Sequence, residues 1–222
     1  MTNFLPSKLP GLLLVLLSVG GAAAGCSSDS DNSPIITAVL LLQTNSASSD
    51  TSCSGSGTCK IFVTSSNATL TSGISGLDSQ CASDANKPSG GGTYKALVAD
   101  GTNRIACTTA NCSGGSSEHT DWVLKASKEY RRSDGTTVIG TTSSNGVFTF
   151  PLTAAVQTTV TGTNVTVTGL NTDWTSSAND CTNFSASGAI TQDGLHDSTS
   201  NALRSIGTSG CGNNMKIICV EQ

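Results

Sequence analysis

The sequence predicts a small α+β domain, mostly strands and loops with one main helix, cross-linked by disulfides. Short apolar segments bounded by Gly, Asn or Pro recur along the chain, as is typical of strands joined by turns. Charged residues make up only 12% of the chain and aromatic residues 4%, which indicates a hydrophobic core with few large side chains. Eight of the nine cysteines form an even set after residue 50, and in an exported chain such a set indicates disulfides that stabilise a lean core.

Export is predicted by the first 25 residues. Lys8 precedes an apolar run, residues 12–19, that is too short to cross a bilayer but suits a signal peptide. Small residues follow and lead directly to Cys26, as at the acylation site of a bacterial lipoprotein. We therefore expect residues 1–25 to be a lipoprotein signal peptide and Cys26 to carry the lipid. Two acyl chains would anchor the protein stably to a membrane surface.

The residues after Cys26 form a polar tether in this interpretation, over residues 26–57, and they leave two alternatives open. Ala23 stands where a lipoprotein site more often has Leu, so an ordinary signal-peptidase cut near Ala24 is the competing interpretation. The apolar run 35–42 has about half the length of a membrane span. It is interpreted as a patch at the base of the tether or as an edge strand.

Residues 58–222 have the length of one domain. The formal net charge of −4 argues against a nucleic-acid partner, which requires a basic face. One helix is expected from Ser75, because Ser75 and Asp78 form a capping-box pattern and apolar residues recur at helical spacing until Asn86 and Pro88. Strands are expected over residues 60–64, 94–98, 136–139, 147–150, 164–168 and 215–220.

Several motifs of this domain resemble endostatin, the C-terminal collagen fragment, in order and spacing. Residues 73–81 followed by 92–96 resemble its first helix and next strand. The later matches are residues 130–134, 150–151, 168–169, Cys181 with Phe184, and Cys211 with residues 217–221. Residues 121–125 and the ending 219–222 are similar to the leptospiral endostatin-like lipoprotein family, and the chain is identified as a member of it on these motifs.

This resemblance implies a C-type-lectin-like fold, in which the first helix is tied to the last strand and a second bridge lies nested inside. Eight cysteines alone allow 105 pairings. The resemblance implies Cys81 with Cys219 and Cys181 with Cys211. Once those are assigned, proximity in the sequence suggests Cys53 with Cys59 and Cys107 with Cys112.

No cofactor or metal is expected. The two histidines, His119 and His196, are far apart, and the cysteine spacings lack the paired knuckles of a zinc site. The calcium-binding motifs of lectins are missing, although two polar groups leave a weak ion site open: Asn171, Asp173, Asn179 and Asp180, and then Asp193, His196 and Asp197. Ser75 is better explained as a helix cap than as a nucleophile, so no catalytic residues are assigned and an enzyme is not expected.

The resemblance implies a lipid-anchored adhesin on the outer membrane. Such an adhesin would bind host extracellular matrix proteins such as laminin, or plasma proteins such as complement factor H or plasminogen. The candidate contact patch is a basic cluster interleaved with aromatic residues: Trp122, Lys125, Lys128, Tyr130, Arg131 and Arg132. The alternative is that both aromatic residues belong to the core and the charges form a solvated face. The alternative function is a structural envelope lipoprotein without a host ligand, and a hydrolase is the third class considered.

Overall fold

The computed structural model describes residues 53–159 and 161–222. This part of the chain is a mixed α+β structure, mostly strands and loops with few helices, in agreement with the predicted class. The described residues do not include the expected signal peptide, Cys26, the apolar run 35–42 or the expected tether up to residue 52. Within the described ranges, no helix is long and apolar enough to cross a membrane.

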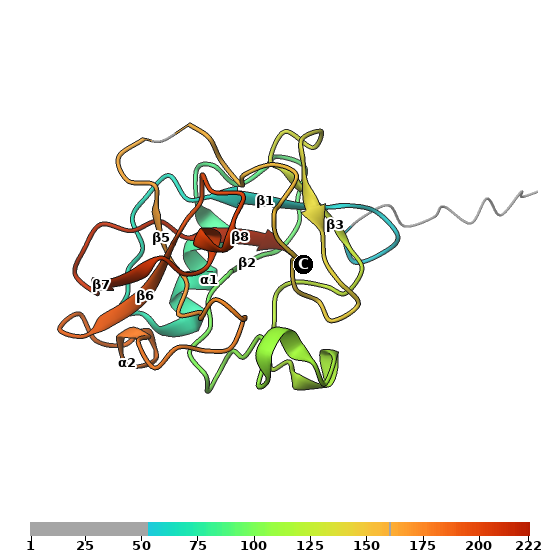
Figure 1. The fold of residues 1–222 in the computed structure, drawn as a ribbon. Coiled ribbons are helices and arrows are strands. Elements are labelled where there is room, and N and C mark those ends of the chain that lie inside the picture. Colours follow the sequence, from blue (N-terminus) through green and yellow to red (C-terminus); the bar gives the residue numbers. More distant parts are fainter. Residues whose placement is uncertain (1–52, 160) are drawn as a thin grey trace, which may run out of the picture. The chain divides into compact units, whose positions relative to one another are not determined.

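The larger of the sheets formed by the described residues has five strands. Their order is β2 (Tyr94–Ala96), β8 (Ile218–Glu221), β1 (Cys59–Val63), β3 (Glu129–Arg132) and β4 (Val138–Thr141). β1 and β3 pair in parallel, and the other neighbours pair antiparallel. The last strand, β8, therefore lies between β1 and β2 instead of at an edge (Figure 1).

The two faces of this sheet carry two separate apolar clusters. In β1, Ile61 and Val63 belong to one cluster, while Phe62 between them belongs to the other. β8 alternates in the same way, with Ile218 on one side and Cys219 on the other. Because successive strand residues point to opposite faces, each strand contributes to both clusters. The sheet is thus buried on both sides.

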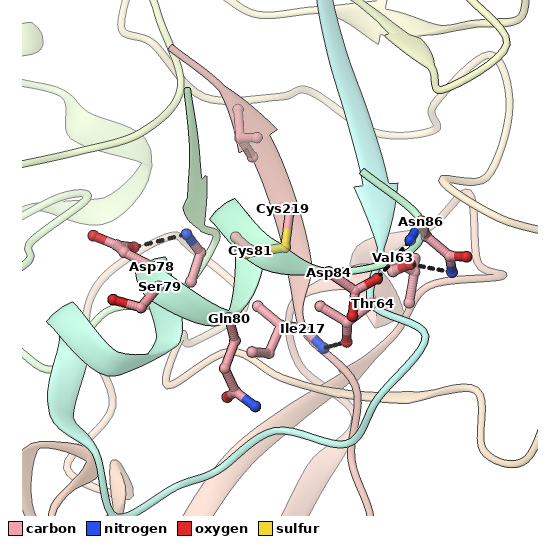
Figure 2. Close-up of a disulfide and its surroundings, with 12 residues drawn as sticks. Val63, Thr64, Asp78, Ser79, Gln80, Cys81, Asp84, Asn86, Ile217 and Cys219 are labelled. Carbon is pink, nitrogen blue, oxygen red and sulfur yellow. Dashed lines mark hydrogen bonds between the residues drawn. A yellow bond between two sulfur atoms is a disulfide. The ribbon is translucent and has the colours of Figure 1, made fainter. Parts of the chain in front are cut away.

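Helix α1 (Gly73–Ser83) covers one face of the sheet through Ile74, Leu77 and Cys81, all buried. The disulfide from Cys81 joins the helix directly to Cys219 in β8 (Figure 2). Beyond the helix, the Asp84 carboxylate accepts hydrogen bonds from the backbone N–H groups of Ser65 and Asn86. The helix is therefore held near its C-terminal end, to β8 by the disulfide and to the segment after β1 by Asp84.

The predicted capping box is wrong. The helix begins at Gly73, so Ser75 lies inside it and its carbonyl accepts a hydrogen bond from the Ser79 hydroxyl. The Asp78 carboxylate accepts the backbone N–H of Ala96 in β2 at 2.9 Å. Asp78 thus joins the helix to the sheet, a tertiary contact that overrides the local capping preference.

A second sheet of the described region has three antiparallel strands. Their order is β5 (Val165–Val167), β6 (Ile190–Leu195) and β7 (Gly207–Gly210). Short helical segments accompany the loops: α2 (Cys181–Phe184), η1 (Ala110–Cys112), η2 (Ser116–Glu118) and η3 (Asn201–Leu203). Gly194 of β6 approaches η3 closely, because a Cβ there would lie 2.1 Å from the Leu203 carbonyl oxygen. The second sheet therefore positions η3 and the residue after it, Arg204.

The predicted strand over residues 147–150 is also wrong. The structure has a single bridge there, between Thr142 and Phe148. The Phe148 carbonyl accepts a hydrogen bond from the indole Nε1 of Trp174 at 3.1 Å. A side chain therefore uses the carbonyl oxygen to which a neighbouring strand would donate a backbone N–H. The segment is consequently a fixed loop with buried Val147 and Phe148.

Four disulfides cross-link the described residues: Cys81–Cys219, Cys181–Cys211, Cys53–Cys59 and Cys107–Cys112. These are the pairs expected above. Cys53 is only 2% exposed and belongs to the core, and Lys128 donates to the Gly55 carbonyl. Residues 53–57, which composition assigns to the tether, therefore pack against the domain.

Candidate binding surface

The aromatic members of the predicted patch turn toward the core. Tyr130 is completely buried, its ring packs edge-on against Phe148, and its hydroxyl accepts the backbone N–H of Lys125 at 2.7 Å. Burial raises the pKa of Tyr130 to about 12. A ligand on the surface cannot reach this side chain, so the prediction that Tyr130 is a contact residue is wrong. Trp122 is half-buried, donates from Nε1 to the Gly146 carbonyl at 2.9 Å and packs edge-on against Trp174.

The basic members of the patch are half-buried and mostly engaged. Arg131 forms an ion pair with Glu129 at 2.7 Å, and Arg132 donates to the Ala155 carbonyl at 2.8 Å. Lys125 and Lys128 line a surface hollow of about 550 Å³ together with residues 54–58, where Lys128 also donates to the Gly55 carbonyl. The structure thus divides the predicted patch: the two lysines share a hollow, whereas the two arginines contribute mainly to the packing of β3.

The polar groups considered as ion ligands serve local structure instead. The Asp173 carboxylate accepts both the backbone N–H and the hydroxyl of Thr175, and the Asp180 carboxylate accepts the backbone N–H of Asn183. In the second group, the Asp193 carboxylate accepts the Ser209 hydroxyl. Among the described residues, no three His, Cys, Asp or Glu side chains come together as ligands of a metal ion.

A second hollow, of about 380 Å³, is built by loops around Arg204. Its wall comes from residues of the loop between 143 and 150, including Val147, Phe148 and Phe150, and its rim includes Asn111 and Asn201. We call this hollow the Arg204 pocket. It brings together η1, the 143–150 loop and η3, three segments far apart in the sequence.

Arg204 is only 4% exposed, and aromatic rings cover its guanidinium group. The central carbon Cζ lies 4.7 Å from the centre of the Phe150 ring and 4.6 Å from that of Trp174. Such contacts between a cation and aromatic rings are attractive. Burial nevertheless lowers the pKa of Arg204 to about 10, and the nearby Asp173 carboxylate only partly opposes this. The guanidinium group is thus a desolvated positive charge.

The loop that carries Asn111 to the rim is organised by Glu118. Its carboxylate accepts backbone hydrogen bonds from Thr108, Thr109 and Gly114, and the Cys107–Cys112 disulfide closes the same loop. The hydrogen bond from the Thr109 hydroxyl, with those from the Thr109 and Gly114 backbone, lowers the pKa of Glu118 to about 2. One carboxylate therefore fixes most of the segment.

We expect the Glu118 carboxyl to titrate with a midpoint near 2, well below its ordinary value of 4.5. Since the folded pKa is depressed, the stabilising contribution is complete above pH 4.5 and is lost as the pH falls through about 2. Carboxyl ¹³C NMR of the labelled chain measures this midpoint. In Glu118→Gln the amide signals of Thr109 and Gly114 should shift at neutral pH. A midpoint near 4.5 in the unchanged chain would show that this hydrogen-bonded arrangement does not form.

Sequence reasoning did not single out Arg204. A lone arginine between Leu203 and Ser205 has no motif, and its aromatic partners Phe150 and Trp174 lie 54 and 30 positions away in the sequence. This site is defined by contacts between residues that are distant in the sequence. A single sequence does not contain such contacts.

Comparison with known families gives one match. Residues 63–202 match the family described as "Protein of unknown function (DUF1554)". The matched range begins at the last residue of β1 and ends within η3, so it includes β2 to β6 and the 143–150 loop but not β7, β8 or Arg204. No curated protein sequence matches the chain.

Proposed function

The chain belongs to the DUF1554 family, and we propose that this member is a surface-exposed bacterial lipoprotein that binds host macromolecules. The partners would be extracellular-matrix proteins such as laminin, or plasma proteins such as complement factor H or plasminogen. In this proposal Cys26 carries the lipid that anchors the chain to the outer membrane. The domain is endostatin-like, with a C-type-lectin-like fold, and acts by binding and not by catalysis.

The fold part of this proposal is supported by the cross-links. The first helix is tied to the last strand by Cys81–Cys219, and the Cys181–Cys211 bridge lies nested within that interval. A helix packed on a mixed sheet whose C-terminal strand is internal accompanies these bridges. The two bridges are those that the resemblance to endostatin implies.

The observation that carries the binding function is a rigid domain whose hollows are built from loops. The Lys125 and Lys128 hollow and the Arg204 pocket are formed mostly by loop residues, and the Cys53–Cys59 and Cys107–Cys112 disulfides close loops that line them. Loops on a rigid scaffold commonly carry recognition, and preorganised loops lose less conformational entropy when a partner binds. Cationic side chains in both hollows favour acidic surfaces on the partner.

The surface location is tested by protease treatment of intact cells. We expect the domain to be cleaved, or the tether cut, before the outer membrane is broken. Protection until the membrane is disrupted would instead favour the structural envelope lipoprotein.

Binding is tested with the full chain, its disulfides intact, on immobilised laminin, fibronectin, factor H and plasminogen. We expect Lys125→Ala with Lys128→Ala to weaken binding to the recognised protein about tenfold, the size of change produced by about 1.4 kcal/mol. Lys87→Gln is the matched control, because Lys87 lies over the Tyr94 ring and lines neither hollow. Unchanged binding in the double variant would show that the Lys125 and Lys128 hollow is not part of the contact surface. If the chain bound none of the four host proteins, the proposal that it binds them would be contradicted.

A further inference from the structure

The Arg204 pocket contains a buried guanidinium group whose N–H groups are not all hydrogen-bonded. Neither Nε nor Nη1 of Arg204 has a hydrogen-bond partner among residues 53–159 and 161–222, although both atoms are buried. A buried charge is costly unless it is paired and hydrogen-bonded. The stacking on Phe150 and Trp174 covers the guanidinium faces but does not satisfy its N–H groups.

Arg104, another buried arginine of the same domain, shows what a purely structural role looks like. It is completely buried, and its guanidinium donates to the carboxylates of Asp78 and Asp121 and to the Ala96 carbonyl. Every side-chain nitrogen of Arg104 therefore has an acceptor. The contrast indicates that the acceptor for Arg204 lies outside the described residues.

The charge and shape of the pocket select the kind of acceptor. Because the Asp173 carboxylate already lies near this single guanidinium group, a ligand with one negative charge is repelled less than a phosphate or sulfate with two. Arginine also matches the planar carboxylate group geometrically. The walls contributed by Val147, Phe148 and Phe150 are apolar, which suits the methylene groups of an acidic amino-acid side chain.

We propose that the Arg204 pocket binds a carboxylate group, supplied by a glutamate or aspartate side chain of a protein partner. The protein source rests on the proposed binding function, whereas the carboxylate site rests on the pocket itself. Asn111 and Asn201 line the same pocket, and a side-chain amide can hydrogen-bond the backbone from which such a side chain projects. Arg204 is then a specificity residue, since its unpaired N–H groups reject a neutral side chain that leaves its charge uncompensated.

The test is an NMR titration of the ¹⁵N-labelled full chain, with its disulfides intact, using N-acetyl-glutamate N′-methylamide. We expect a saturable shift of the Arg204 Nε–H signal and of the amides of residues 147–150. The corresponding glutamine derivative, which has the same shape without the charge, should shift neither. Equal responses to the two compounds, or none up to 100-fold over the protein, would overturn the proposal.

Two variants separate ligand binding from folding. Arg204→Gln should weaken glutamate binding at least tenfold, read from the amides of residues 147–150. Thr149→Trp fills the mouth from an exposed rim position and leaves the guanidinium group in place, so it should weaken binding while the unfolding midpoint stays unchanged. Lys87→Gln removes one positive charge elsewhere and should bind as the unchanged chain does. Full binding in Thr149→Trp with an unchanged fold would exclude this pocket as the site.

Other ligands and partners complete the test. Tighter binding of sulfate than of the glutamate derivative would overturn the carboxylate assignment, and binding of glucuronate without glutamate would overturn the protein source. The same variants measured on immobilised host proteins separate the two proposals. If Arg204→Gln leaves host binding unaffected, the role of the pocket in that binding is contradicted and the proposed function stands. If the chain binds the glutamate derivative but no host protein, the carboxylate site stands and the proposed function is contradicted.

Discussion

Replacing Cys81 and Cys219 together by alanine is expected to lower the free energy of unfolding by about 5 kcal/mol. The bridge spans 138 positions, and both cysteines are completely buried where α1 meets β8. In the chain-entropy description, a cross-link restricts the unfolded chain more as the loop it closes becomes longer. Because a typical domain is stable by about 5–15 kcal/mol, this loss would leave the domain marginal or unfolded.

The matched control is the Cys107→Ala, Cys112→Ala variant. That bridge closes a separation of only 5 positions, so its removal should lower the free energy of unfolding by about 2 kcal/mol. Urea unfolding of the two double variants, followed by tryptophan fluorescence with the other bridges oxidised, compares the losses directly. Similar losses in the two variants would contradict the view that the long bridge limits the unfolded chain.

The elements that sequence reasoning predicted are those with a strong local or covalent signal. Apolar segments gave β1, β2, β5 and β8 approximately, and the helical period gave α1 within two residues of its observed start. The disulfide pairs came from the resemblance, since eight cysteines alone leave their connectivity open. These features depend on short stretches of sequence or on a few cysteines.

Features that depend on contacts between distant residues were not predicted. β6 contains Gln192 and Asp193, which are polar yet buried through hydrogen bonds to β7 and its neighbours, so its sequence lacks a strand's apolar alternation. Tyr130 was assigned to the surface from its charged neighbours, but as a strand residue between half-exposed Glu129 and Arg131 it points to the opposite face. Arg204 required both Phe150 and Trp174 to be brought to it by the fold.

The acidic residue in the supposed capping box had a larger role than the sequence indicated. Asp78 binds Arg104, and Arg104 also binds Asp121, so one guanidinium group joins α1, β2 and the loop after η2. The distances from Arg104 to the Asp78 oxygens are 2.9 and 2.8 Å. This is a two-pronged ion pair, whose fixed geometry a lysine cannot reproduce.

Replacing Arg104 by methionine is expected to lower the free energy of unfolding by about 3 kcal/mol, the lower end of the range for breaking a buried ion pair. The lower end applies because the Asp78 and Asp121 side chains are 22% and 40% exposed and water can reach them. Arg104→Lys should recover only part of the loss. Urea unfolding at pH 7 measures each variant.

The same variant should change the dependence of stability on pH. Burial alone would raise the pKa of Asp121, but hydrogen bonds from Lys95 and Arg104 outweigh it and hold the pKa below its ordinary value of 3.8. The stabilising contribution is therefore complete above that value and is lost as the pH falls through the lower, folded value. In Arg104→Met this acid-sensitive part should shrink.

A double-mutant cycle with Asp78→Asn identifies the pair as the cause, because contacting charges give non-additive losses. Once Arg104 is methionine, removing the Asp78 charge should cost little or restore stability, since the carboxylate no longer has its partner. Additive losses, with an unchanged acid dependence, would mean that Arg104 acts by filling space alone. Arg104 would then no longer serve as the paired arginine with which Arg204 is compared. The proposal that the Arg204 pocket binds a carboxylate would depend on the titration with the glutamate derivative.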